Sequence, residues 1–349
     1  MEIRKDSAFW HLAWLIPLLI LCMLISLSVG ASSLSVVDSL RIMLAKIPFL
    51  RKVVDISDIR TAYITIVWQV RLPRIIMSAL VGGGLAMVGA SFQGLFRNPL
   101  ADPHILGVSS GAAAGATIAM LSGITLSIGG LSAVGIFAFI GALVTVFSVY
   151  RIACVGNKVA VTNILLTGTA ISSMLSAVIS LLMSLNHDDI EKVYMWTLGS
   201  FSAATWKKIL FLVIAIVAGG IILLVFAKEL DLIATGEETA ASLGVDTAVV
   251  KRSIIIAASL LVAACVSVSG IIGFVGLVIP HCIRFFCGPK HSRLLPLCMV
   301  GGAIFMVICD TISRTLIAPS EIPVGVVTAL FGAPYFIVLL QRNKRKAGY

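Results

Sequence analysis

Apolar residues run along this chain in long continuous blocks that are separated by short polar stretches. A block of about 20 apolar residues crosses the hydrocarbon core of a membrane as a helix. The blocks do not alternate between apolar and polar positions, as the strands of a membrane barrel would. Because only helices and closed barrels satisfy their own backbone hydrogen bonds in lipid, the pattern predicts an all-α polytopic membrane protein.

The blocks predict ten transmembrane helices within a single transmembrane domain that covers residues 1–349. The expected spans are about 12–32, 72–91, 104–121, 131–151, 162–185, 208–227, 253–270, 272–286, 294–314 and 323–340. The first block is too long and begins too deep for a simple signal peptide, so we expect it to remain as a helix. With ten spans both termini share one side. A basic tail indicates that this side is the cytoplasm, through Arg342, Lys344, Arg345 and Lys346.

Composition supports the membrane location. Hydrophobic residues make up 59% of the chain and charged residues 12%, whereas a soluble domain carries about 25% charged residues. The net charge of +10 lies mainly in residues that flank the blocks, where it sets topology, so we expect no nucleic-acid partner. Seven basic residues between Arg41 and Arg74 fall on the outer side by this topology, an unusual excess. The seven cysteines are scattered without a CxxC pair, which indicates buried thiols and no metal site.

Small residues predict close helix packing in the third span. Gly107, Gly111 and Gly115 are spaced by four residues and form a flat stripe on one helix face. In the eighth span we expect Pro280 to kink or interrupt the helix. The outer segment from about 33 to 71 mixes apolar and basic residues, as expected of a segment on the membrane surface, and Trp196 and Trp206 suit interfacial anchoring.

One short polar segment, TGEETAASLG at 235–244, stands between two apolar blocks. Thr235 and Glu238 have the spacing of a capping box, and Gly244 is a suitable residue to end a helix. The segment therefore predicts a short helix at the cytoplasmic surface. It is either an ordinary loop helix or a projection that fits a cleft in another protein.

The chain carries no evident catalytic constellation. The phosphate-loop motif of nucleotide hydrolysis is absent from the sequence, and so is any Ser/His/Asp or paired-carboxylate pattern. His104 and His281 are isolated and fit packed or loop positions. Asp310 and Arg314 lie one helical turn apart and fit a structural or surface-facing pair better than a proton relay. We therefore expect a partner ATPase to supply the energy, with a gradient-driven carrier or a membrane enzyme as the alternatives.

Several motifs occur together and in order from Arg71 to the C-terminus. They are RLPR (71–74), NPLADPHILGVSSGA (98–112), GEETAASLG (236–244), GFVGLVIPHCIR (273–284), HSRLLP (291–296) and EIPVGVVTALFGAPYFIVLL (321–340). Together they closely resemble the permease subunits of the FecCD family, the type II ABC importers for iron-siderophores, haem and cobalamin.

The resemblance implies a permease that is not itself an enzyme and works by alternating access in a bacterial cytoplasmic membrane. It implies a dimer with a second copy or a homologue, two cytoplasmic ATPases that bind ATP and Mg, and an extracytoplasmic substrate-binding protein. No cofactor is expected in this chain. Ferric siderophore is the first substrate expected, followed by haem and cobalamin. Whether the dimer contains one or two kinds of chain stays open.

The resemblance also implies roles for particular residues. Docking of the binding protein is assigned to cations on the outer surface, Arg71, Arg74 and Arg314, for which interfacial anchoring is the alternative. Cytoplasmic gates are assigned to Asn98, Leu100, Val161 and Thr162. The ATPase coupling helix contains Thr235, Gly236, Glu237, Glu238, Ala240, Leu243 and Gly244. The pathway is lined by the fifth span through Thr167, Thr169, Ser172, Ser173, Ser176 and Ser180, unless these hydroxyls bond back to their own helix.

Overall fold

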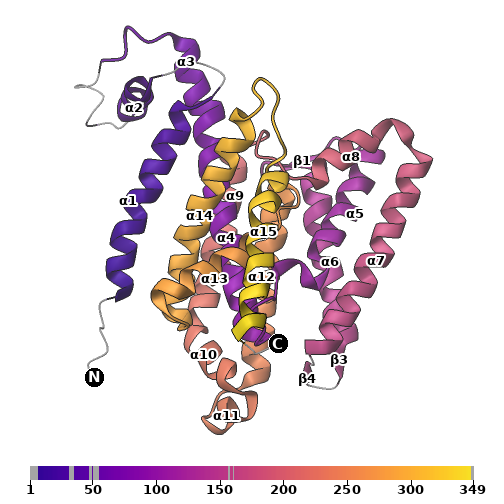
Figure 1. Cartoon of the computed structure of the whole chain (residues 1–349). Coiled ribbons are helices and arrows are strands. Elements are labelled where there is room, and N and C mark those ends of the chain that lie inside the picture. The colour runs from indigo at the N-terminus through magenta and orange to yellow at the C-terminus, as the bar shows by residue number, and fades with distance from the viewer. Residues whose placement is uncertain are drawn as a thin grey trace.

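Helices occupy all ten predicted blocks in the computed structural model, which describes residues 7–30, 35–46, 49, 55–155, 158–159 and 161–346 (Figure 1). The main helices are α1 (Ser7–Ser28), α4 (Leu72–Leu95), α5 (Val108–Leu121), α6 (Ala133–Ala153), α7 (Val161–Leu185), α9 (Trp206–Val225), α12 (Thr247–Ser269), α13 (Val275–Cys287), α14 (His291–Thr315) and α15 (Val324–Lys346). The all-α prediction is confirmed. Within the described residues, seven helices are long and apolar enough to cross a membrane, while α5, α13 and the apolar part of α15 are shorter.

Short elements connect the long helices. Helical ones are α2 (Val36–Leu44), α3 (Thr61–Thr65), the π-helix η1 (Ile66–Arg71), the 3-10 helices η2 (Pro103–Leu106) and η3 (His187–Asp189), α8 (Ile190–Thr197), α10 (Ala227–Thr235) and α11 (Glu237–Ser242). Two small antiparallel hairpins pair β1 (Ser127–Ile128) with β2 (Leu131–Ser132) and β3 (Cys154–Val155) with β4 (Lys158–Val159). On the outer segment, Ser35 caps α2 by accepting a bond from the Asp38 amide.

Helix α4 lies at the centre of the bundle. It packs against α14, α13, α12 and α9, and nearly all of its residues are buried. One close approach joins Gly82 on α4 to Gly302 on α14, since a Cβ atom on either glycine would collide with the other's backbone. Helices α3, η1 and α4 form one continuous apolar stretch, Thr61–Leu95, which is longer than the predicted span. Arg71 and Arg74 therefore lie inside a helix and not at its outer end.

The predicted glycine stripe packs α5 against α6. A Cβ on Gly111 would collide with Thr145 and the Gly141 carbonyl, and one on Gly115 would collide with the Phe137 carbonyl. This confirms the prediction for these two residues. Gly107 has a different role, because it adopts a φ of 73° at the junction between η2 and α5 and its α-carbon faces Ser172 on α7.

Of the two expectations for Pro280 in the eighth span, an interruption is wrong, because α13 continues through this proline, and a kink stays a prediction. Proline lacks the N–H that would bond to the carbonyl four residues earlier, which here belongs to Gly276. The side-chain amide of Gln93 on α4 donates to that carbonyl at 3.2 Å and so replaces the missing bond. Helix α13 begins at Val275, three residues after the expected start of the span at about 272.

The two edges of the bundle are formed by α1 and α7, which lie at opposite sides in Figure 1. Only 11% of the residues in the apolar part of each helix are buried within this chain. The described start of α1 and the described end of α15 lie at the same end of the bundle as α10 and α11. Faces this open must be covered by lipid or by another subunit.

Candidate functional sites

Helices α10 and α11 form a compact projection at one end of the bundle (Figure 1). The predicted capping box is wrong. Thr235 is the last residue of α10, and its hydroxyl bonds back to the Leu232 carbonyl at 2.7 Å. Gly236 precedes α11 with a φ of 153°, a conformation that L side chains rarely adopt, so Glu238 has no cap to complete. The short helix itself is present, and Gly244 follows its end with a φ of 84°, as predicted for the C-terminal glycine.

Side-chain contacts fix this projection to the long helices. Ala240 is buried, and the carboxylate of Glu237 forms an ion pair with Lys251, a buried residue on α12. The carboxylate of Asp231 on α10 accepts from the His291 backbone N–H at 2.8 Å and lies 2.6 Å from Nδ1 of that histidine. The bond to the backbone caps the first turn of α14. These contacts join α11 to α12 and α10 to α14.

Leu243 directly follows α11 and is 63% exposed. Glu238, Ala241 and Ser242 are also exposed. Single exposed apolar residues are common on protein surfaces, so the role of this segment as the ATPase coupling helix stays a prediction.

The three arginines predicted for docking gather at the opposite end of the bundle, near the junction of η1 with α4 and the end of α14. Nε of Arg74 lies 2.9 Å from Oδ1 of Asp310, and its Nη1 lies 2.7 Å from Oε1 of Glu321. Arg314 donates to the Val29 carbonyl at 2.9 Å and to the Ser26 hydroxyl at 2.7 Å. Arg71 donates to the Leu27 carbonyl at 2.7 Å. The cluster thus joins α1, α4, α14 and the segment that precedes α15.

The expectation that these arginines stand on the outer surface is wrong. Arg71 is 6% exposed, Arg74 is 6% exposed and Arg314 is 9% exposed. Charged groups are tolerated at such depth when carboxylates and carbonyls surround them, as they do here. Asp310, which was expected to form a structural or surface-facing pair with Arg314, is fully buried. Its Oδ2 is 3.6 Å from Nε of Arg314, so the structural alternative is the correct one. A docking role for the three arginines stays a prediction.

The predicted gate residues occupy two separate segments. Asn98 forms a tight turn after α4, in which its side-chain oxygen accepts from the Leu100 amide at 2.9 Å. Leu100 is exposed, and so is Thr162 at the start of α7. Val161 begins α7, but its side chain lies outside the described residues. The gate role stays a prediction for all four.

The predicted lining residues of α7 do not share one face. Thr169, Ser173, Ser176 and Ser180 recur every three or four residues and are exposed, so they form one hydroxyl stripe. A second exposed face carries apolar residues at a similar spacing, namely Met174, Val178, Leu181 and Leu185. Ser172 approaches Gly107 at the end of η2, and Thr167, which is half-buried, lies two turns before Met174 on the side of the apolar face. Thr169 and Ser180 also bond back to their own helix, at 2.8 Å and 2.9 Å.

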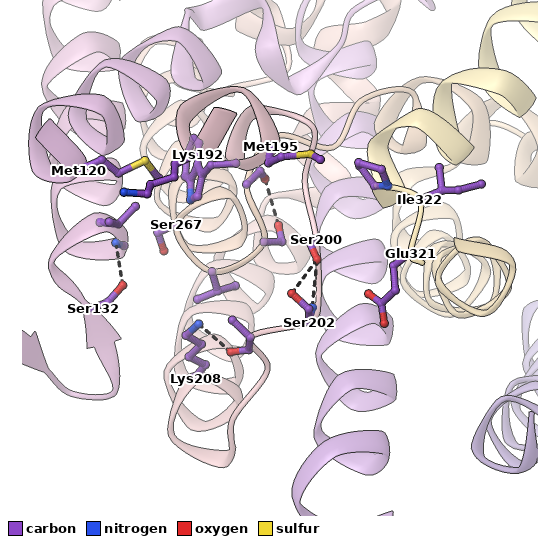
Figure 2. Close-up of a pocket in the computed structure, with 18 residues that line it drawn as sticks. Met120, Ser132, Lys192, Met195, Ser200, Ser202, Lys208, Ser267, Glu321 and Ile322 are labelled. Carbon is purple, nitrogen blue, oxygen red and sulfur yellow. Dashed lines mark hydrogen bonds between the residues drawn. The ribbon is translucent and has the colours of Figure 1, made fainter. Parts of the chain in front are cut away.

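A cavity of about 500 Å³ opens near the arginine cluster, between α6, α8, the end of α12 and the start of α15 (Figure 2). Its charged lining residues are Lys192, Lys208 and Glu321. Lys208 donates to the Ala203 carbonyl at 2.7 Å, and Lys192 lies 2.7 Å from Asp189. Serine hydroxyls complete a polar wall. Sequence reasoning did not identify this cavity, because its residues come from five distant segments.

Other polar residues that the sequence did not single out also prove to be paired. Gln93 accepts a hydrogen bond from Arg284 while it donates to α13, and Lys251 pairs with Glu237. The predicted packed positions of the two histidines are confirmed. Nε2 of His104 lies 3.0 Å from the Ile272 carbonyl, and His281 packs edge-on against Phe285. A signal was available in each case, since a polar residue inside an apolar block needs a partner.

Comparison with known proteins identifies the family to which this chain belongs. The sequence profile of the FecCD transport family matches residues 18–342, so the chain belongs to that family. It is 42% identical over 282 residues to the cobalamin import system permease protein BtuC of Halobacterium salinarum, covering 81% of this chain and 75% of that protein. It is 38% identical over 344 residues to the molybdate import system permease protein MolB of Haemophilus influenzae, covering 98% of both.

A solved structure agrees with the sequence relatives. A metal-chelate type ABC transporter in an inward-facing conformation superposes with a TM-score of 0.81 at 34% identity, covering 95% of this chain and 98% of that one. The chain is therefore an ABC importer permease, a multi-pass membrane subunit without catalytic function of its own. Permeases of this kind act with ATPase and binding-protein partners.

Proposed function

We propose that this permease carries a metal chelate inward by alternating access, driven by two partner ATPases that bind ATP and Mg. The observation that carries the proposal is the projection formed by α10 and α11. It exposes Leu243 at its tip, and the Glu237–Lys251 and Asp231–His291 contacts attach it to α12 and α14. A partner that closes around this tip can move these helices, which is what coupling of ATP hydrolysis to transport requires.

The outward-facing surfaces support a second permease subunit. Helix α7 is open on two faces, one with hydroxyls and one apolar. A hydroxyl face gains nothing from contact with lipid tails, whereas it suits a water-filled pathway. We place the pathway between this chain and a second permease, either a copy or a homologue, with Thr169, Ser173, Ser176 and Ser180 facing the substrate.

The substrate we propose first is a ferric siderophore or haem, with cobalamin as the alternative within the same family. The relatives named above carry cobalamin or molybdate in their names, and the structural neighbour is of the metal-chelate type. Cobalamin, molybdate and metal chelates all contain a metal. The hydroxyl stripe carries no charged side chain, so it supports weak contact with the cargo, and the binding protein is left to select it.

For the orientation, we place the chain in a bacterial cytoplasmic membrane with both termini and α11 in the cytoplasm. The described start of α1 and the described end of α15 lie at the same end of the bundle as α10 and α11, which supports this arrangement (Figure 1). The arginine cluster and the cavity then face outward, towards the binding protein. No cofactor is assigned to this chain.

An uptake assay tests the proposal and the substrate together. The permease is reconstituted with its cognate ATPase, and the cognate binding protein is loaded in turn with a radioactive ferric siderophore, haem, cobalamin or molybdate. We expect ATP-dependent accumulation of an iron chelate. Accumulation of cobalamin or molybdate alone would replace the substrate assignment. Equal uptake without nucleotide but with an ion gradient would favour a secondary carrier.

A further inference from the structure

Arg74 binds two carboxylates that differ in their surroundings. Its Nε contacts Asp310, which is fully buried on α14. Its Nη1 contacts both oxygens of Glu321, at 2.7 Å and 3.0 Å. The Glu321 side chain is 42% exposed and lies in the segment between α14 and α15. One carboxylate is therefore a fixed part of the core, whereas the other covers the arginine from the solvent side.

Asp310 serves two cations, because Nε of Arg74 lies 2.9 Å and Nε of Arg314 lies 3.6 Å from its carboxylate. If Glu321 left, these two guanidinium groups would share the Asp310 carboxylate. An acidic side chain from outside would then be attracted strongly to the exposed Nη1 of Arg74, because guanidinium groups bind carboxylates with two parallel hydrogen bonds.

We propose that Glu321 is an intramolecular substitute for a carboxylate of the docking partner. In the undocked permease it occupies Arg74, and on docking an acidic side chain of the binding protein replaces it. The inference rests on the proposed function, since it takes the binding protein as the partner. It also accounts for the low exposure of Arg74, because the partner reaches this arginine only after Glu321 has moved.

The position of Glu321 links this exchange to the transport helices. The next residue, Ile322, is joined to Ser313 on α14 by two hydrogen bonds, one of which has its donor and acceptor 2.9 Å apart. Two residues further on, the amides of Val324 and Gly325 at the start of α15 donate to the Gly199 and Leu198 carbonyls after α8. Release of Glu321 thus acts on the point where α15 is attached to the rest of the outer face.

The cavity provides a place for the released carboxylate. Glu321, Ile322 and Pro323 all line it, and Figure 2 shows Glu321 on the side opposite Lys192 and Met120. Lys192 and Lys208 supply positive charge within the same cavity. A carboxylate that leaves Arg74 therefore enters a polar, water-accessible space and does not have to cross an apolar surface.

Docking affinity of the cognate binding protein for the permease in lipid nanodiscs tests the inference. Glu321→Gln removes the competing charge, and we expect tighter docking. If Arg74 is free about a tenth of the time in the wild type, the gain is about tenfold. Glu191→Gln is the matched control, because Glu191 is an exposed carboxylate on α8 at the same end of the bundle. It corrects for the general attraction of an acidic partner when one negative charge is lost.

A second variant distinguishes competition from a structural brace. Glu321→Asp keeps the charge but shortens the reach to Arg74, so competition predicts tighter docking and a brace predicts weaker docking. The inference is overturned if Glu321→Gln changes the affinity no more than Glu191→Gln does, or if Glu321→Asp weakens docking while the melting temperature is unchanged. If the binding protein does not bind the wild-type permease at all, the docking part of the proposed function fails with it.

Discussion

Arg74 and Asp310 form an ion pair with 2.9 Å between Nε and Oδ1, although 236 residues separate them in the sequence. The pair joins the first turn of α4, the central helix of the bundle, to the last part of α14. Asp310 also faces Arg314 at 3.6 Å, so one buried carboxylate serves two buried cations. The geometry predicts that this carboxylate is important for holding the outer half of the fold together.

Asp310→Asn should therefore destabilise the permease strongly. Removing one member of a buried ion pair leaves the other charge without compensation, which costs about 3–5 kcal/mol. We expect a clear fall in the melting temperature of the purified chain in detergent. The matched control is Asp58→Asn, because Asp58 forms a bidentate pair with Arg41 in the solvent-exposed outer segment, where such pairs contribute little. Equal melting temperatures for the two variants would contradict this interpretation.

The fold was largely predictable because the hydrophobic block is a strong signal. A block of about 20 apolar residues has few alternatives to a membrane helix, and helices are present in all ten predicted blocks. Boundaries were less predictable where proline and glycine occur. Pro280 does not break α13, because Gln93 supplies the missing hydrogen bond from another helix. Such compensation depends on a residue far away in the sequence, so local reasoning could not find it.

The sequence identified residues of the candidate sites but not the side chains that surround them in the structure. Arginines at the edge of an apolar block look like surface anchors, and only the three-dimensional structure brings Asp310 and Glu321 to Arg74. The capping box predicted for α11 is wrong for a similar reason. The Thr235 hydroxyl has two possible uses, and the preceding helix α10 extends far enough to include it. Sequence spacing alone does not decide between neighbouring helices that compete for one residue.

The hydroxyl stripe on α7 gives a prediction about water access. Cysteines substituted for Ser173, Ser176 and Ser180 should react with a charged, membrane-impermeant thiol reagent in the assembled transporter, since this face is assigned to the pathway. Cysteines at Met174 and Leu181, on the apolar exposed face of the same helix, should react at least about tenfold more slowly, because thiol reagents need an ionised thiol in water. Labelling of the unmodified chain measures the background from its seven native cysteines. Equal labelling of the two faces would rule out a dedicated pathway face.

The tip of α11 gives a prediction about the ATPase. Leu243→Asp should weaken ATPase binding by about 2 kcal/mol or more, or roughly thirtyfold, as expected for an anchor residue in an interface. The melting temperature of the isolated permease should not change, because this side chain is 63% exposed. Ile128→Asp, a similar change at an exposed position of the β1–β2 hairpin at the other end of the bundle, should leave ATPase binding intact. Normal ATPase binding by Leu243→Asp would mean that the contact surface lies elsewhere.

The ion pair between Glu237 and Lys251 gives a prediction about coupling. Glu237→Gln leaves Lys251 buried on α12 without its carboxylate, a loss of about 1–3 kcal/mol. With α11 loosened, we expect the assembled transporter to hydrolyse ATP while substrate uptake falls. Exchanging the two residues, as Glu237→Lys with Lys251→Glu, should restore part of the uptake. If uptake and hydrolysis fall in parallel, and the exchange restores neither, the pair has no specific role in transmission.

The central claim is that movement of this permease is imposed from the cytoplasmic side through α11. Substrate uptake into proteoliposomes tests it most directly, with the binding protein outside and ATP inside. The permease with its cognate ATPase should accumulate substrate with ATP but not with a non-hydrolysable analogue, and the Leu243→Asp variant should fail under both conditions. Full-rate uptake by the permease alone, without any ATPase or nucleotide, would contradict the account.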